Sequence, residues 1–271
     1  MVHLKKKGFT RLKIGITIVS LIVAIITKSD IDWSNLLNNC FELSLAKELI
    51  YDLSVGVFSA MILVWFIDEI GNRIQERQSQ EKEKATIRRF DKVLQQYIEQ
   101  YITMFYCVAT PLDKRNFENV EMPEHFTLSD MRDLHQTSLL IKEKLSGDAI
   151  ESFLQIELTL RNEFISLIEK NDFEHYPQFA DIFLNYVQKS IYYDSRSAIL
   201  DMSQAKRVGD ASLVKSIHDL LESHADDYYQ KMLHGEDIGG NLAHPYIFLY
   251  ELMKEERKLI LQYQDEIRKI G

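Results

Sequence analysis

Two long apolar segments lie within the first 70 residues, and the remainder of the chain is polar. We predict spans at about 9–27 and 49–67, each close to the length that crosses one hydrocarbon core. Arg11 and Lys13 near the start of the first span can extend their charged ends to the interface. The second span contains a single charged residue, Asp52. Residues 1–70 are therefore expected to form a transmembrane hairpin.

The charges that flank the spans predict how the hairpin is oriented. A basic cluster before an apolar run is also typical of a signal peptide, but no small-x-small cleavage pattern follows residue 23. Five Lys or Arg residues precede the uncharged run that begins at Ile14, two lie between the spans and six lie within 71–89. Because positive loops stay on the cytoplasmic side, we expect both termini to be cytoplasmic and residues 28–48 to be external.

Small and polar residues recur along both spans. They are Ser20, Ala24, Asp52, Ser54, Gly56, Ser59 and Ala60. Small residues at a spacing of four allow helices to approach closely in lipid. Two interpretations remain open: these residues pack the hairpin, or they line a pore between protomers. Asp52 lies one helical turn from the external boundary, so a carboxylate that reaches interfacial water is a further alternative.

A charged helical stalk is predicted at 71–89, as a continuation of the second span. An apolar stripe begins near its end, with alternating spacings of three and four that are typical of a heptad seam. Its members are Ile87, Phe90, Leu94, Tyr97, Tyr101, Met104 and Val108. The stripe fits either the core of a bundle or a coiled coil for self-association. Pro111 is expected to end this helix.

Residues 90–271 predict a cytoplasmic helical bundle, because no useful stretch alternates with a period of two. Further helices are expected at about 127–145, 148–170, 177–205, from Gly209 to about Leu233, and 245–270. The predicted fold class is an all-α membrane protein with an N-terminal two-helix hairpin followed by this bundle.

Motifs of common enzymes are missing from the sequence: it contains no phosphate-binding glycine loop, no HExxH pair and no GxSxG elbow. His218 and Asp219 resemble the adjacent pair of metal phosphohydrolases, with His175 and Asp226 or Asp227 as conceivable further ligands. A histidine on the flank of a helix is the ordinary interpretation. We therefore expect no enzyme activity, no cofactor and no bound metal.

The charge of the bundle indicates which partners it favours. Residues 90–271 contain 19 Lys and Arg against 31 Asp and Glu, a net charge of −12. This charge disfavours direct nucleic-acid binding and favours a basic protein partner. The stalk carries a net charge of +3 and suits anionic headgroups. Cys40 and Cys107 are predicted on opposite sides of the bilayer, where they cannot form a disulfide with each other.

Two spans at residues 14–67, a short acidic external loop and a helical cytoplasmic body without a catalytic motif resemble the two-transmembrane effectors of bacterial anti-phage systems. Among these, the chain resembles the effector of membrane-targeting retrons. The resemblance implies a toxin of the inner membrane that a reverse transcriptase and its reverse-transcribed DNA hold inactive. It also implies release on phage attack, permeabilisation of the membrane and abortive infection.

Several copies are required for a pore, because two helices cannot enclose an aqueous path, so a homo-oligomer is expected. Two other classes remain open. The first is a membrane-anchored sensor or scaffold, in which the hairpin is only a tether. The second is an enzyme with an unrecognised helical active site.

Overall fold

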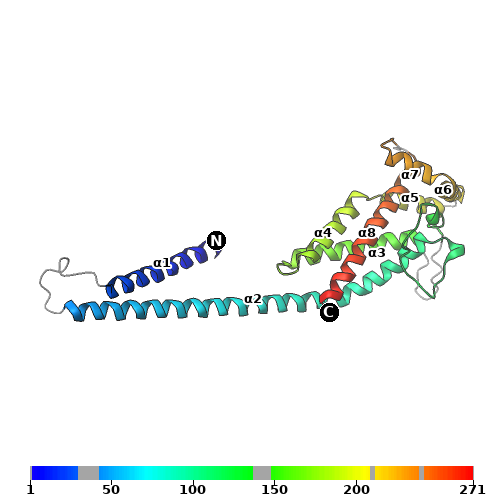
Figure 1. The fold of residues 1–271 in the computed structure, drawn as a ribbon. Helices are drawn as coiled ribbons and strands as arrows, with labels where there is room; N and C mark the ends of the chain where they lie inside the picture. The colour runs from blue at the N-terminus through cyan, green and yellow to red at the C-terminus, as the bar shows by residue number, and fades with distance from the viewer. Residues whose placement is uncertain (1, 30–42, 137–147, 208–210, 238–240, 271) are drawn as a thin grey trace. The chain divides into compact units, whose positions relative to one another are not determined.

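A computed structural model describes residues 2–29, 43–136, 148–207, 211–237 and 241–270 (Figure 1). All regular secondary structure in these ranges is helical, so the predicted all-α class is confirmed. The α-helices are α1 Val2–Lys28, α2 Leu43–Ala109, α3 Ala149–Lys170, α4 Pro177–Tyr192, α5 Arg196–Arg207, α6 Ala211–Ser223, α7 Ala225–Leu233 and α8 His244–Ile270. Short 3-10 helices lie at Leu112–Lys114 and Ser129–Met131.

The chain divides into two compact units, Met1–Glu81 and Lys82–Gly271. Helix α2 is continuous and contributes to both. The second unit begins before the predicted boundary at residue 90, since the backbone N–H of His175 donates to a Glu83 carboxylate oxygen at 3.1 Å and Ile87 is fully buried. The predicted stalk is helical, and its last residues are already part of the bundle.

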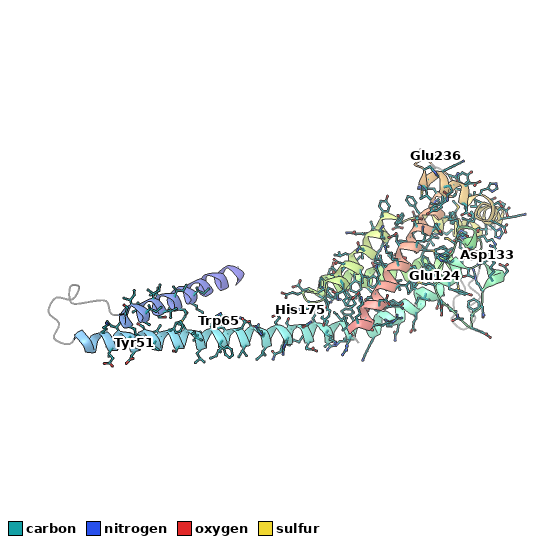
Figure 2. The ribbon with its side chains drawn as sticks, in the orientation of Figure 1. Tyr51, Trp65, Glu124, Asp133, His175 and Glu236 are labelled. Atoms are coloured by element: carbon teal, nitrogen blue, oxygen red, sulfur yellow. The ribbon has the colours of Figure 1, made fainter. Side chains whose placement is uncertain are left out.

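From Lys47 onward, α2 contains an apolar stretch with the length and composition needed to cross a membrane. Almost none of this stretch is buried. Its large side chains point outward, as Figure 2 shows around Trp65, which is 60% exposed. A water-soluble surface rarely carries so continuous an apolar patch.

Four helical segments form the core of the second unit: the C-terminal part of α2 with α3, α4 and α8 (Figure 1). Helices α2 and α8 run in opposite directions. The Tyr263 hydroxyl donates to Asp91 at 2.7 Å, and the Arg88 guanidinium donates to the Ile270 carbonyl at 2.8 Å. The last turn of α8 is therefore fastened to the start of the bundle segment of α2.

Aromatic rings fill the space between these helices. The Phe164 and Phe183 rings stack with centroids 4.6 Å apart, and the Tyr186 ring meets Phe164 edge-on at 4.8 Å. The ring of Tyr101 in α2 lies 5.3 Å from the ring of Phe153 in α3. Buried aromatic pairs of this kind contribute about 0.5–1.5 kcal/mol beyond the area they bury.

The helix predicted at 127–145 is wrong over its described part, and the rest of it lies outside the described residues. Residues 127–136 form the 3-10 helix Ser129–Met131 and turns. The carbonyls of Leu134 and Gln136 accept hydrogen bonds of 3.0 and 2.9 Å from the first two backbone N–H groups of α3. These bonds use carbonyls that a continuing α-helix needs for its own ladder.

Two other predicted helices are each divided. The segment at 177–205 forms α4 and α5. Between them the backbone turns, and Asp194 Oδ1 accepts a 3.1 Å hydrogen bond from the backbone N–H of Arg196, the first residue of α5. The segment that ends near Leu233 forms α6 and α7, which are separated by His224. The backbone φ of His224 is −132°, far from the helical value.

Candidate functional site

The predicted span residues occupy two kinds of position. Three are buried: Ser20, Ala24 and Ser54. The other four are exposed: Asp52, Gly56, Ser59 and Ala60. A Cβ atom added at Gly56 meets no other atom within 4 Å. The predicted set therefore divides into residues that pack within one chain and residues that face outward.

Two contacts at widely separated points join α1 to α2. The Lys13 ammonium forms an ion pair with Asp68. The Lys47 ammonium donates to the Ser29 carbonyl at 3.1 Å. Between these contacts, Ser20 and Ser54 line the same surface hollow. These contacts pair residue 13 with residue 68 and residue 29 with residue 47.

The predicted heptad stripe lies in the core of the second unit. Ile87, Leu94, Tyr101, Met104 and Val108 are buried, and Phe90 and Tyr97 are half-buried against the same core. All seven positions pack against the other helices of the bundle. Packing within one chain accounts for the spacing of the stripe.

Cys107 is also buried in this core. Burial raises the pKa of its thiol to about 11, against a smaller opposing effect of the Arg115 charge. Cys40 lies outside the described residues.

Two glutamates with no accessible surface lie inside the bundle, and their oxygens are held from several helices. Glu256 of α8 accepts a 2.7 Å hydrogen bond from the Tyr101 hydroxyl of α2. Glu157 of α3 accepts a 2.5 Å bond from Ser190 of α4 and forms an ion pair with Arg196 of α5. Five helices therefore meet at two buried carboxyl groups.

The two carboxyl groups differ in their surroundings. Burial, then the negative charge of Glu157, raises the pKa of Glu256 well above its ordinary value, which favours a neutral carboxylic acid. Among the described residues, Glu256 Oε1 and the buried Tyr186 hydroxyl have no hydrogen-bond partner. Burial and the neighbouring Glu256 also raise the pKa of Tyr186. Ionisation of Glu256 or Tyr186 therefore costs free energy of folding.

A second buried polar network includes a histidine that sequence patterns did not single out. His135 is 2% exposed. Its Nδ1 lies 3.0 Å from the Ser203 hydroxyl and its Nε2 lies 2.8 Å from the Tyr246 hydroxyl. These contacts join the turn after the second 3-10 helix to α5 and α8.

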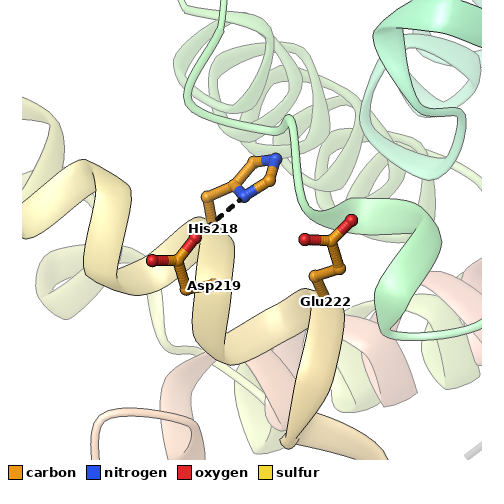
Figure 3. Close-up of side chains that lie close together, drawn as sticks. All are labelled: His218, Asp219 and Glu222. Atoms are coloured by element: carbon orange, nitrogen blue, oxygen red, sulfur yellow. Dashed lines mark ion pairs between the residues drawn. The ribbon is translucent and has the colours of Figure 1, made fainter.

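His218 lies in a small surface cluster with Asp219 and Glu222 (Figure 3). Its Nδ1 is 3.5 Å from Asp219 Oδ1 and its Nε2 is 3.4 Å from Asp133 Oδ1. Arg132 Nε lies 3.8 Å from Glu222 and balances part of the negative charge. The arrangement fits a solvated helix flank, because Asp219 and Glu222 are exposed.

The further ligands considered for His218 do not gather around it. Figure 2 places His175 and Asp133, a partner of His218, at opposite ends of the bundle. The contacts described for α7 do not bring Asp226 or Asp227 to this cluster.

No protein-family model matches the chain, and neither the curated proteins nor the solved structures include a significant match.

Proposed function

We propose that this protein is a membrane-permeabilising toxic effector of a retron-type anti-phage system. In this proposal, α1 and the first part of α2 are two spans in a bacterial inner membrane, and both termini are cytoplasmic. A basic partner, such as a reverse transcriptase with its reverse-transcribed DNA, holds the bundle in an inactive state. Release of that partner allows several copies to assemble and breach the bilayer.

The observation that carries the proposal is the exposed apolar surface of these two helices. Ile18, Ile22 and Ile25 of α1 are 51%, 48% and 60% exposed, and Leu53 and Leu63 of α2 are 68% and 59% exposed. Transfer of such a side chain from water contributes roughly 1.5–3 kcal/mol each. Insertion into a bilayer removes all of these apolar side chains from water.

The contacts between the two helices also suit a hairpin in lipid. Ser20 and Ser54 donate to carbonyls of their own helices at 3.0 and 2.7 Å, so their hydroxyls need no water. The Lys13–Asp68 ion pair lies near Trp65, at the depth expected for the inner interface.

One outward face of α2 has the composition of an assembly surface. Asp52, Gly56, Ser59 and Ala60 recur at helical spacing, and all four are exposed in the single chain. A carboxylate in a span is costly unless it faces protein or water. An oligomer that turns this face inward supplies that environment and allows close approach at Gly56.

Control by the bundle is supported by the continuity of α2. The same helix carries the apolar stretch and the buried residues Leu94, Tyr101 and Met104 of the bundle core. A partner that acts on the bundle therefore acts on a helix that also enters the membrane. The net charge of −12 on residues 90–271 favours a basic partner.

The proposal is tested by growth and membrane potential in a bacterium that expresses the full chain alone. The matched control replaces the spans at 9–27 and 49–67 with an unrelated two-span hairpin. We expect rapid depolarisation and arrested growth with the native spans only. Normal potential and growth, with insertion verified, contradict the proposal and favour a tethered sensor or scaffold.

A further inference from the structure

A pocket of about 480 Å³ lies at the end of the bundle where α4 and α7 end and α8 begins. Tyr192 lines it from the last turn of α4, Tyr193 directly follows that helix, and Leu233 of α7 and Phe248 of α8 complete this part of the lining. Figure 2 shows Glu236, another lining residue, at this end of the bundle. This pocket is separate from the apolar helices and from the buried glutamates.

The Tyr193 ring is nearly perpendicular to both of its aromatic neighbours, Tyr192 and Phe248. The Tyr192 and Tyr193 rings have centroids 4.8 Å apart and planes at 88°, and Tyr193 meets Phe248 at 5.8 Å and 87°. Tyr192 is 72% exposed, a large value for an aromatic side chain. Perpendicular rings present both faces and edges, and the faces attract cations.

Acidic residues surround these rings. Glu236, Asp237 and Glu251 line the pocket, so three carboxylates share it with the aromatic faces. Glu251 is already held, since it accepts hydrogen bonds from the Tyr229 hydroxyl at 2.5 Å and from the Lys254 ammonium at 2.9 Å. Glu236 is exposed and adds negative charge to the lining of the pocket.

The same region already binds a cation of its own chain in this way. The Lys254 ammonium lies 5.6 Å from the centre of the Tyr229 ring and 5.0 Å from that of Tyr250. Lys189 lies 5.8 Å from the centre of the Tyr193 ring and is paired with Glu255 at 3.2 Å. One face of Tyr193 is thus occupied, and the Phe248 ring lies 4.4 Å from the His244 ring, so the exposed Tyr192 ring is the one best placed to receive a ligand.

We propose that this pocket binds an arginine or lysine side chain from a basic segment of a partner protein. The exposed aromatic face receives the cation, Glu236 neutralises its charge, and the neighbouring apolar Leu233 covers its methylene stem. Charge complementarity selects this occupant over an apolar or acidic segment, because the surrounding bundle is strongly negative. The proposal does not depend on whether the protein permeabilises membranes.

Fluorescence anisotropy with the full-length protein in detergent micelles tests this site. The probe is a labelled hexapeptide with two arginines, compared with its citrulline counterpart, which has similar shape and no charge. Tyr192→Ala removes an exposed ring, whereas Tyr192→Phe keeps it. Glu236→Gln and the distant exposed Glu99→Gln each remove one negative charge.

We expect the arginine peptide to bind and the citrulline peptide to bind at least tenfold more weakly. Tyr192→Ala and Glu236→Gln should each weaken arginine binding by roughly threefold to thirtyfold. Tyr192→Phe and Glu99→Gln should leave it unchanged. Equal binding of the two peptides, or equal effects of the two glutamine variants, overturns the proposal.

Discussion

The Tyr101 hydroxyl donates a 2.7 Å hydrogen bond to Glu256, a contact that joins α2 to α8 across 155 residues of sequence. Both side chains are fully buried. Glu157 lies nearby with its own partners, Ser190 and Arg196. The centre of the bundle therefore depends on the protonation and pairing of two carboxyl groups.

The stability of the protein should fall as pH rises above the ordinary pKa of glutamate. The pKa of Glu256 is raised in the folded state from 4.5, so its contribution is fully present below that value and is lost as pH rises through the folded pKa. Over this window the slope reaches about 1.4 kcal/mol per pH unit. Glu256→Gln should remove this slope.

Chemical unfolding of the full chain in detergent, followed by circular dichroism from acid to mildly alkaline pH, measures the difference. Glu99→Gln is the matched control, because Glu99 is exposed on α2. If the unfolding free energy of wild type and of Glu256→Gln depends on pH in the same way, Glu256 does not have a raised pKa in the folded state.

Breaking the ion pair between Glu157 and Arg196 should be strongly destabilising. Glu157→Ala leaves Arg196, whose side chain is 17% exposed, without its main buried partner, at a cost of about 3–5 kcal/mol. Arg196→Ala should cost a similar amount, and the double variant should cost clearly less than the sum. Additive losses in the unfolding free energy would show that the two residues are not coupled.

Tyr246→Phe should destabilise the bundle by about 1–2 kcal/mol. The substitution keeps the ring but removes the hydroxyl that lies 2.8 Å from His135 Nε2, which leaves that buried nitrogen without this bond. Tyr192→Phe removes a hydroxyl at an exposed position and should change the unfolding free energy by less than about 0.5 kcal/mol. Equal effects of the two variants would show that the hydrogen bond to His135 does not contribute to stability.

Asp52→Leu and Gly56→Leu should each abolish toxicity without preventing insertion. Both positions are exposed in the single chain, so the substitutions alter the proposed assembly face rather than the contact between α1 and α2. Val55→Leu, also exposed, is the control and should remain toxic. Growth after induction is measured beside membrane fractionation, and full toxicity of both variants would exclude these residues from the mechanism.

Long apolar periodicity predicted the helical class and several helix positions well. Pro111 and Pro177 marked the end of α2 and the start of α4, because proline cannot continue a helix but suits its first turn. The breaks at Asp194 and His224 were not predictable from the stripe, since apolar spacing continues through them. A local hydrogen bond from the Arg196 backbone N–H to Asp194 accompanies the first of these breaks.

The buried glutamates were missed, although a signal was present. Glu256 falls in the stripe between Met253 and Ile260, and Glu157 lies between Phe153 and Leu160, so each occupies a core position of its helix. A charged residue in such a position indicates a buried network. The partners Tyr101 and Arg196 come from distant segments, and only the fold reveals them.

The most direct test of the proposed effector function uses the purified full-length protein in lipid vesicles that hold a potassium gradient and a potential-sensitive dye. The account predicts that the wild-type chain dissipates the gradient without any partner, and that Asp52→Leu, incorporated to the same extent, does not. An intact gradient with wild-type protein that is verified to span the bilayer would contradict the account.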